Sequence, residues 1–197
     1  MVMHSSWFIQ SIQNRERIRL IEKRLLSARD LALMGMMVAV IEACKFVMAS
    51  LPNIELTSFW LILFTLMIGW KIVFVVPVFI LLEGMIYGFG LWWVMYLYAW
   101  PILVLITWFL RKQDSVWIFS ILSSAFGLCF GLLCAIPYFF IGFVDGGVLS
   151  GLIAAFNWWI AGIPFDLIHG ASNFIVMLLL YKPVKRVMLS ADKMNKN

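Results

Sequence analysis

Long apolar runs without any charged side chain dominate the chain. Residues 84–110 and 115–144 contain no Asp, Glu, Lys or Arg, and three shorter runs are equally free of charge. A helix needs about 20 mainly apolar residues to cross a bilayer, and fewer where other helices surround it. The runs therefore predict six membrane-spanning helices. Their expected ranges are 31–51, 56–69, 72–88, 91–110, 115–142 and 152–181.

The composition supports a membrane protein and excludes several other classes. Of the 197 residues, 64% are hydrophobic and only 13% are charged, about half the usual charged share of roughly 25%. A soluble domain of this size cannot bury so much apolar surface. A membrane barrel would show short alternating segments rather than continuous apolar runs. We therefore expect a single all-α integral membrane domain, not a soluble enzyme, a disordered chain or a disulfide scaffold.

The positions of the basic residues predict the orientation. Fourteen of the fifteen Lys and Arg residues precede span 1, follow span 6, or lie between spans 2 and 3 or spans 4 and 5. Cytoplasmic loops carry an excess of Lys and Arg, so this distribution places both termini in the cytoplasm. Lys45 is the exception. The net charge of +5 is explained by this orientation and does not indicate a nucleic-acid partner.

Two flanking segments are expected outside the membrane domain of residues 28–184. Residues 1–27 interleave aromatic and aliphatic side chains with basic ones, which suits an amphipathic helix on the inner leaflet. A disordered tail is the alternative, and a cleavable signal is not expected, because no apolar core precedes a small-residue cleavage site. Residues 185–197 form the expected cytoplasmic tail, disordered from Ser190 onward.

Ionisable side chains inside a membrane segment are costly, so each is a candidate functional residue. Glu42 and Lys45 stand three positions apart, as do Asp166 and His169, and Glu83 lies in span 3. Residues at this spacing share a helix face. The alternatives are a structural ion pair for Glu42 and Lys45, and a hydrogen bond that sets helix packing for Asp166 and His169. No second histidine lies within the spans, so we expect no metal site.

Aromatic side chains provide a second signal. Trp92, Tyr96 and Trp100 recur every four residues and form one stripe, and Trp158 is expected on the same side of the membrane. Such a stripe can stack on a planar ligand, with the Tyr hydroxyl and Trp N–H groups as polar contacts. An interfacial aromatic belt is the alternative.

Small side chains provide a third signal. Ala32, Gly35 and Ala39 are spaced so that they lie on one face of span 1. A small-xxx-small pattern lets a second helix approach closely. The partner helix belongs either to the same bundle or to another subunit, and the pattern leaves both possibilities open.

Together these features resemble the S components of energy-coupling factor (ECF) vitamin transporters. The stretch 28–39 is similar to their first helix, in which an AxxxA motif docks on a coupling subunit, with Gly35 here in place of the first Ala. The segments 51–55, 83–93 and 162–173 are also similar. The resemblance covers about residues 28–184.

The resemblance implies a function and a set of partners. The chain would bind a scarce vitamin with high affinity in an outward-facing pocket of a bacterial cell membrane. It would associate with a transmembrane coupling subunit and two ATPase subunits, without a cofactor or enzymatic activity of its own. The surface formed by Ala32, Gly35 and Ala39 would dock on the coupling subunit. The expected substrate-binding residues are Glu42, Lys45, Asn53, Glu55, Trp92, Tyr96, Trp100, Asn157, Trp158, Asp166, His169 and Asn173.

The ligand and two other functional classes stay open. Many Trp side chains and few charges favour a large or planar, weakly charged ligand, with cobalamin or a related corrinoid as the first hypothesis. A folate, flavin, pyridoxine or nucleobase-like vitamin is an alternative. A stand-alone small transporter would work without partner subunits. An intramembrane enzyme would use Asp166 and His169 as acid and base, although the known hydrolase motifs are missing from the sequence.

Overall fold

The computed structural model describes residues 26–194, with side chains described to residue 191. This described part is 87% helical and contains no strand. This confirms the expected all-α class. The predicted amphipathic helix lies outside the described residues, apart from residues 26 and 27.

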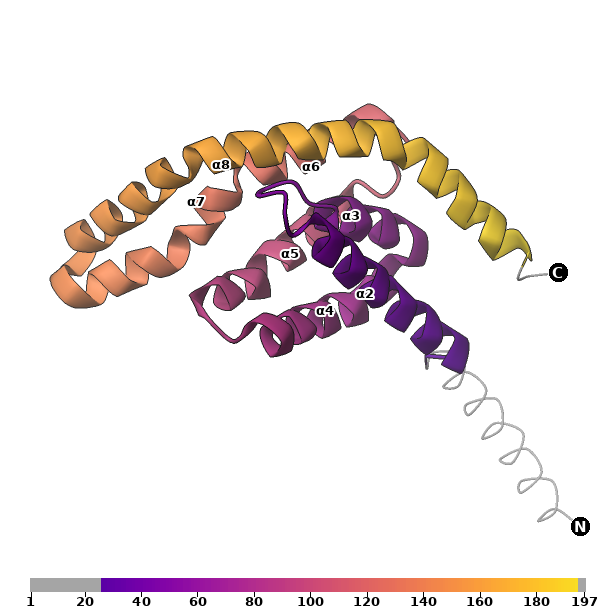
Figure 1. Ribbon diagram of the computed structural model, residues 1–197, viewed down its shortest axis with the longest axis horizontal. Coiled ribbons are helices and arrows are strands. Elements are labelled where there is room, and N and C mark those ends of the chain that lie inside the picture. Colours follow the sequence, from indigo (N-terminus) through magenta and orange to yellow (C-terminus); the bar gives the residue numbers. More distant parts are fainter. Residues whose placement is uncertain (1–25, 195–197) are drawn as a thin grey trace, which may run out of the picture. The chain divides into compact units, whose positions relative to one another are not determined.

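Helices α2 to α5 begin and end close to the limits expected from the apolar runs, whereas the run 115–144 is divided among α6, α7 and the start of α8. Figure 1 shows the order of the helices. Glycines with positive φ mark two of the breaks between them: Gly69 after α3 and Gly88 after α4. Glycine adopts this backbone conformation without steric cost. The elements are α2 (Ala28–Met48), α3 (Thr57–Ile68), the 3₁₀ turn η1 (Gly69–Lys71), α4 (Ile72–Tyr87), α5 (Leu91–Phe109), α6 (Val116–Leu128), α7 (Phe130–Cys134) and α8 (Ile136–Met194).

Four helical stretches of the described chain are long and apolar enough to cross a membrane. They are Ala28–Met48, Thr57–Tyr87, Leu91–Phe109 and Phe130–Ala191. These lengths and compositions are compatible with a membrane-spanning protein. The number of six crossings and the cytoplasmic position of the termini stay predictions.

The chain forms two compact units, Met1–Met36 and Met37–Asn197. The described part of the first unit contains the start of α2, where Ser27 and Asp30 cap the helix. The Ser27 backbone N–H donates to Asp30 Oδ2 at 3.1 Å, and the Asp30 backbone N–H donates to Ser27 Oγ at 3.1 Å. This reciprocal arrangement satisfies amides that a helix start leaves unpaired. The features described below lie in the second unit unless stated otherwise.

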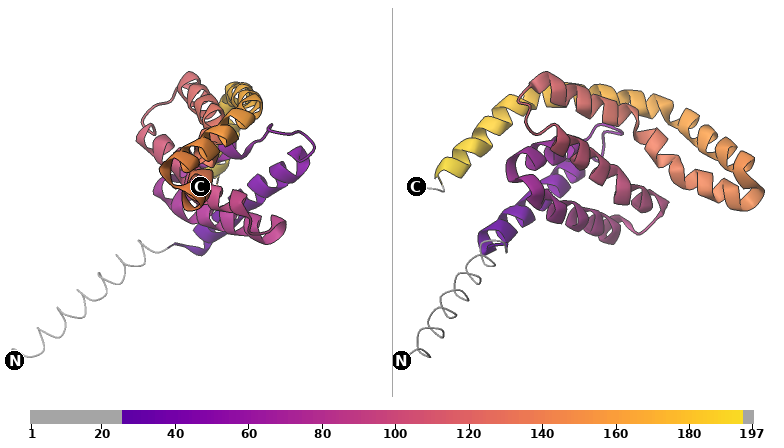
Figure 2. Two further views of the ribbon diagram at one scale, coloured as in Figure 1. Left: turned by 90° about the vertical axis from the view of Figure 1, so that its left-hand side faces the viewer. Right: turned by 180° about the vertical axis from the view of Figure 1, so that it is seen from behind.

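A glycine-based reversal divides α8 into two antiparallel arms. Gly146 and Gly147 leave the helical conformation, and Gly147 has a φ of 75°. The chain turns back at this point, and the two arms run side by side (Figures 1 and 2). A Cβ on Gly151 would lie 2.6 Å from the carbonyl oxygen of Phe139. The absence of a side chain at Gly151 therefore allows the two arms to approach closely.

The most extensive helix contact in the second unit joins α6 to the later arm of α8. At its centre Gly127 faces Gly170, and a Cβ on Gly127 would lie 2.9 Å from Gly170 Cα. Close backbone approach through small residues is typical of membrane helices. The sequence pattern drew attention to small residues on span 1, whereas this tight contact involves spans 5 and 6.

The expected disorder from Ser190 onward is wrong up to residue 194, because α8 continues to Met194. Residues 184–194 contain no glycine or proline and are rich in residues with good helix propensity, such as Lys, Arg, Met and Leu. Helix propensity therefore favours continuation of α8 beyond Ser190.

The loop between α5 and α6 is attached to α8 by polar contacts. Asp114 accepts hydrogen bonds from Lys185 and, at 3.1 Å, from the Tyr181 hydroxyl. The hydrogen bond from Lys185 is the main reason why the pKa of Asp114 lies below its ordinary value. A carboxyl whose pKa is lower in the folded protein adds stability above its unfolded pKa of about 3.9.

Asp114→Asn is expected to lower stability slightly at neutral pH and to have no effect in acid. Most of the Asp114 side chain is exposed, so solvent screening limits the loss to about 0.2–1 kcal/mol. As pH falls through the folded pKa, Asp114 itself becomes neutral and the difference disappears. Thermal unfolding of both proteins in detergent, at neutral and acidic pH, measures this. A difference that grows toward acid would contradict the assignment.

Candidate functional site

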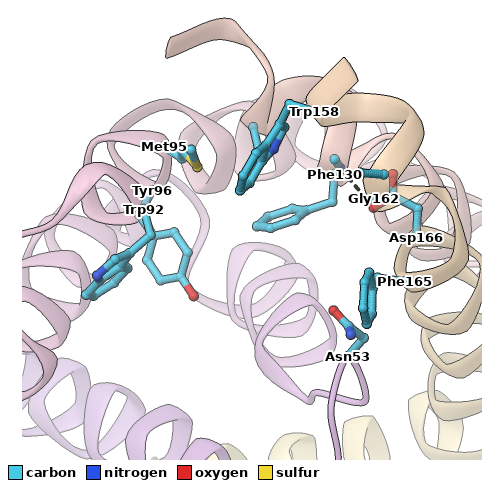
Figure 3. Close-up of a pocket in the computed structure, with 12 residues that line it drawn as sticks. Asn53, Trp92, Met95, Tyr96, Phe130, Trp158, Gly162, Phe165 and Asp166 are labelled. Carbon is cyan, nitrogen blue, oxygen red and sulfur yellow. Dashed lines mark hydrogen bonds between the residues drawn. The ribbon is translucent and has the colours of Figure 1, made fainter. Parts of the chain in front are cut away.

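A cavity of about 570 Å³ opens between α5, α7 and the later arm of α8. Figure 3 shows aromatic side chains from all three helices around it. Asn53, from the loop after α2, completes the wall. The lining residues are Asn53, Trp92, Met95, Tyr96, Phe130, Gly131, Cys134, Trp158, Ala161, Gly162, Phe165 and Asp166.

The α5 side of the cavity is the predicted aromatic stripe. Trp92 and Tyr96 both line it and contact each other edge to face, with ring centroids 5.2 Å apart. Trp158 comes from α8 and stacks on Tyr138 of the opposite arm, with centroids 3.9 Å apart and planes tilted by 15°. Aromatic contacts of this kind limit side-chain movement. The cavity therefore presents aromatic surfaces that are already held in place.

Asp166 is the one ionisable carboxyl group on the cavity wall. Its Oδ1 accepts a hydrogen bond of 2.9 Å from the backbone N–H of Gly131. That amide lies in the first turn of α7, where helix N–H groups have no partner within the helix. A Cβ on Gly131 would lie 2.3 Å from Asp166 Oδ2. Glycine at this position thus allows the carboxyl to reach the backbone.

The wall has little charge. Aromatic, aliphatic and sulfur-containing side chains supply most of the lining, and no Lys, Arg or His belongs to it. Asp166 is 7% exposed, and its Oδ2 has no hydrogen-bond partner. Faces of aromatic rings attract positive charge. The cavity is therefore suited to a planar ligand that is neutral or positively charged.

Glu55 and His169, both predicted to bind the ligand, contact each other. The distance from His169 Nε2 to Glu55 Oε1 is 3.1 Å. Glu55 also accepts hydrogen bonds from the backbone N–H and hydroxyl of Ser58, at the start of α3. Burial alone would raise the pKa of Glu55. The hydrogen bond and the electrostatic interaction with His169, with hydrogen bonds from Ser58 and Thr57, lower the pKa of Glu55 to about 2. This pair joins the loop after α2 to α8.

Three further predicted residues lie away from the cavity wall. Asn173 is buried, and its Nδ2 donates to Ser58 Oγ and to the Ser123 carbonyl, each at 3.3 Å. Trp100 is 2% exposed and packs on the aromatic rings behind the cavity. Asn157 is exposed on α8. Trp100 therefore supports the wall through Tyr96 and Phe130, whereas Asn173 joins α8 to α3 and α6, and Asn157 does not belong to the wall.

Glu42 and Lys45 also lie behind the cavity. The spacing along α2 suggested that they form an ion pair with each other, but Lys45 Nζ contacts Glu83 on α4. Lys45 also donates to the Tyr96 hydroxyl at 3.3 Å. Helical spacing identifies neighbours on one face, whereas the closest partner here comes from another helix. Tyr96 connects this charged group to the cavity.

Sequence reasoning missed more than half of the lining. Ala161, Gly162 and Phe165 follow Trp158 at intervals of three, four and seven residues, so they share its helix face. Extending the face that contains Trp158 and Asp166 would have found them. Phe130, Gly131 and Cys134 follow the break between α6 and α7 at Cys129, and the flanking Gly127 and Gly131 were the only local signal for it.

The residues predicted to dock on a coupling subunit are exposed. Ala32, Gly35 and Ala39 all have exposed positions on α2. Comparison with known proteins found no family model, no curated protein and no solved structure that matches the chain.

Proposed function

We propose that this chain is the membrane-embedded ligand-binding component of a nutrient importer, of the ECF S-component type. The observation that supports it best is the preformed, largely aromatic cavity with a single buried carboxyl group. Pockets of this kind, mostly apolar with a few polar groups, are typical of small-molecule binding sites. The apolar helices are compatible with a position in the membrane.

The cavity supports a ligand of moderate size. Its volume of about 570 Å³ falls within the range of roughly 300–1,000 Å³ found for sites of drug-sized ligands. A corrinoid with its side chains is much larger than such a ligand. We therefore favour a planar ring compound, neutral or positively charged, over the corrinoid that the number of Trp residues first suggested.

Transport would depend on partner subunits. The sequence contains no GxxxxGK[ST] phosphate-binding motif, so the energy for uptake would come from ATPase subunits through a transmembrane coupling subunit. Exposed small side chains at Ala32, Gly35 and Ala39 suit close packing against a helix of that subunit.

Gentle purification followed by mass spectrometry of the bound small molecule is the primary test. The proposal expects one planar ring compound, bound without chemical change, and uptake that stops when the ATPase subunits are absent. Uptake by the chain alone would instead indicate a stand-alone transporter. Conversion of the compound by the purified protein would indicate an enzyme.

Gly162→Phe is expected to fold and to lose ligand binding. Gly162 lines the cavity, and no heavy atom lies within 4 Å of the point where its Cβ would be. A phenyl ring there has room to enter the cavity and would occupy the space of the ligand. We expect at least a tenfold loss of affinity, about 1.4 kcal/mol, in a titration of the purified protein with the identified compound.

Ile163→Phe is the matched control, because Ile163 is the next residue on α8, is 37% exposed and does not line the cavity. It should bind the compound as the wild type does. Equal affinity in both variants would place the binding site elsewhere.

A further inference from the structure

A second buried polar group lies behind the cavity, where α2, α4 and α5 meet. It consists of Glu42 and Lys45 from α2, Glu83 from α4 and Tyr96 from α5. Glu83 is 1% exposed. Lys45 Nζ contacts Glu83 Oε2, donates to the Tyr96 hydroxyl, and lies 5.0 Å from the centroid of the Tyr96 ring. Glu42 interacts with both Glu83 and Lys45.

Two oxygen atoms in this group have no donor. Glu42 Oε1 and Glu83 Oε1 are both buried, and neither has a hydrogen-bond partner. An ionised carboxylate can only accept hydrogen bonds. Leaving such an acceptor buried and unpaired costs about 1–3 kcal/mol, and more when it carries charge. Because the two carboxyl groups interact with each other, one proton between them would give both oxygens a partner.

The balance of charge leads to the same conclusion. Two ionised carboxylates beside one ammonium group would leave an excess negative charge in a region with little water. Two neighbouring buried carboxyl groups seldom ionise together, since like charges at short distance repel strongly. Lys45 beside Glu83 would repel a metal cation. The other titratable groups that face this region are Tyr87 of α4, Glu55 of the loop before α3 and Cys134 of α7, and none of them supplies a positive charge.

We propose that Glu42 and Glu83 together bind one proton, and that this proton site is linked to the ligand cavity through Lys45 and Tyr96. With the proton bound, the group is neutral overall and Lys45 stays between Glu83 and the Tyr96 hydroxyl. Loss of the proton adds a negative charge next to Lys45, draws it toward the two carboxylates, and weakens its contact with Tyr96. Since Tyr96 lines the cavity, ligand binding then depends on pH.

Infrared spectroscopy of the full-length protein in detergent tests the proposal without a known ligand. A neutral carboxylic acid has a carbonyl stretching band that an ionised carboxylate lacks, and the band shifts to lower frequency in ²H₂O. The wild type should show such a band at neutral pH and lose it toward alkaline pH. Glu42→Gln should remove this band, because the amide then donates to Glu83 and no proton is needed.

Glu83→Gln should remove the band as well, so that the result does not depend on one variant that fails to fold. Asp166→Asn is the matched control: it replaces a buried carboxyl outside this group by a neutral amide, and its Oδ1 can still accept from Gly131. It should keep the band. The proposal is overturned if the wild type has no neutral-acid band, if both Gln variants retain it, or if Asp166→Asn abolishes it. None of these outcomes bears on the proposed import function, which the bound-compound experiment tests separately.

Discussion

Cells that carry Gly35→Trp or Ala39→Trp are expected to lose ligand uptake, while each purified variant still binds the ligand as tightly as the wild type. Both positions are exposed and small, so an indole ring there keeps a partner helix from close approach. Neither residue lines the cavity. Uptake of the identified compound, measured beside its affinity for the purified protein, separates transport from binding. The expected loss of uptake is nearly complete.

Leu33→Trp is the control for these variants. Leu33 is 38% exposed on α2 but lies outside the row of small residues, so the indole ring should leave uptake unchanged. Normal uptake with Trp at both Gly35 and Ala39 would show that this surface does not dock on a coupling subunit. A loss of binding in the same variants would point to misfolding instead.

Gly127→Leu is expected to cause the largest loss of stability among the substitutions considered. The new side chain would meet the backbone of Gly170, which cannot move aside as the end of a flexible side chain can. Overpacking in a core typically costs 1–3 kcal/mol and occasionally more. Here it would separate α6 from α8, the most extensive helix contact of the second unit. We expect a variant with a much lower unfolding temperature in detergent, or one that does not fold.

Ala125→Leu provides the comparison, because Ala125 lies two residues away on α6 and is exposed. Its unfolding temperature should stay close to that of the wild type. If Gly127→Leu unfolds at the same temperature as Ala125→Leu, the two helices are not as closely packed as the structure shows.

The sequence was most informative about the helices, because their prediction depends on one property, the hydrophobicity of continuous runs of residues. Continuous apolar runs predicted the all-helical class and the approximate limits of α2 to α5, whereas α6, α7 and α8 differ from the expected spans 115–142 and 152–181. The disorder predicted after Ser190 was wrong up to residue 194, where residues of good helix propensity continue α8. The break at Cys129, between α6 and α7, lies between Gly127 and Gly131, but these glycines were not interpreted as a helix break.

The candidate site was predicted only in part, because helical spacing relates residues of one helix and does not relate residues of different helices. Helical spacing placed Trp92 with Tyr96 correctly, because both residues belong to one helix. It could not show that Lys45 contacts Glu83 or that His169 contacts Glu55, since these partners are brought together by the tertiary fold. Gly131 was missed because its role lies in a backbone amide and in the side chain it lacks. Such roles are not visible in residue chemistry.

The reversal at Gly146 and Gly147 brings together most of the cavity lining from one stretch of the chain. Eight of the twelve cavity-lining residues lie within the single stretch 130–166, which this reversal folds back on itself. Under the proposed function, most ligand contacts would therefore come from this one stretch of the chain, while the small residues of α2 lie outside it. Substitutions within residues 130–166 would then change the cavity wall and leave the sequence around Gly35 and Ala39 unaltered.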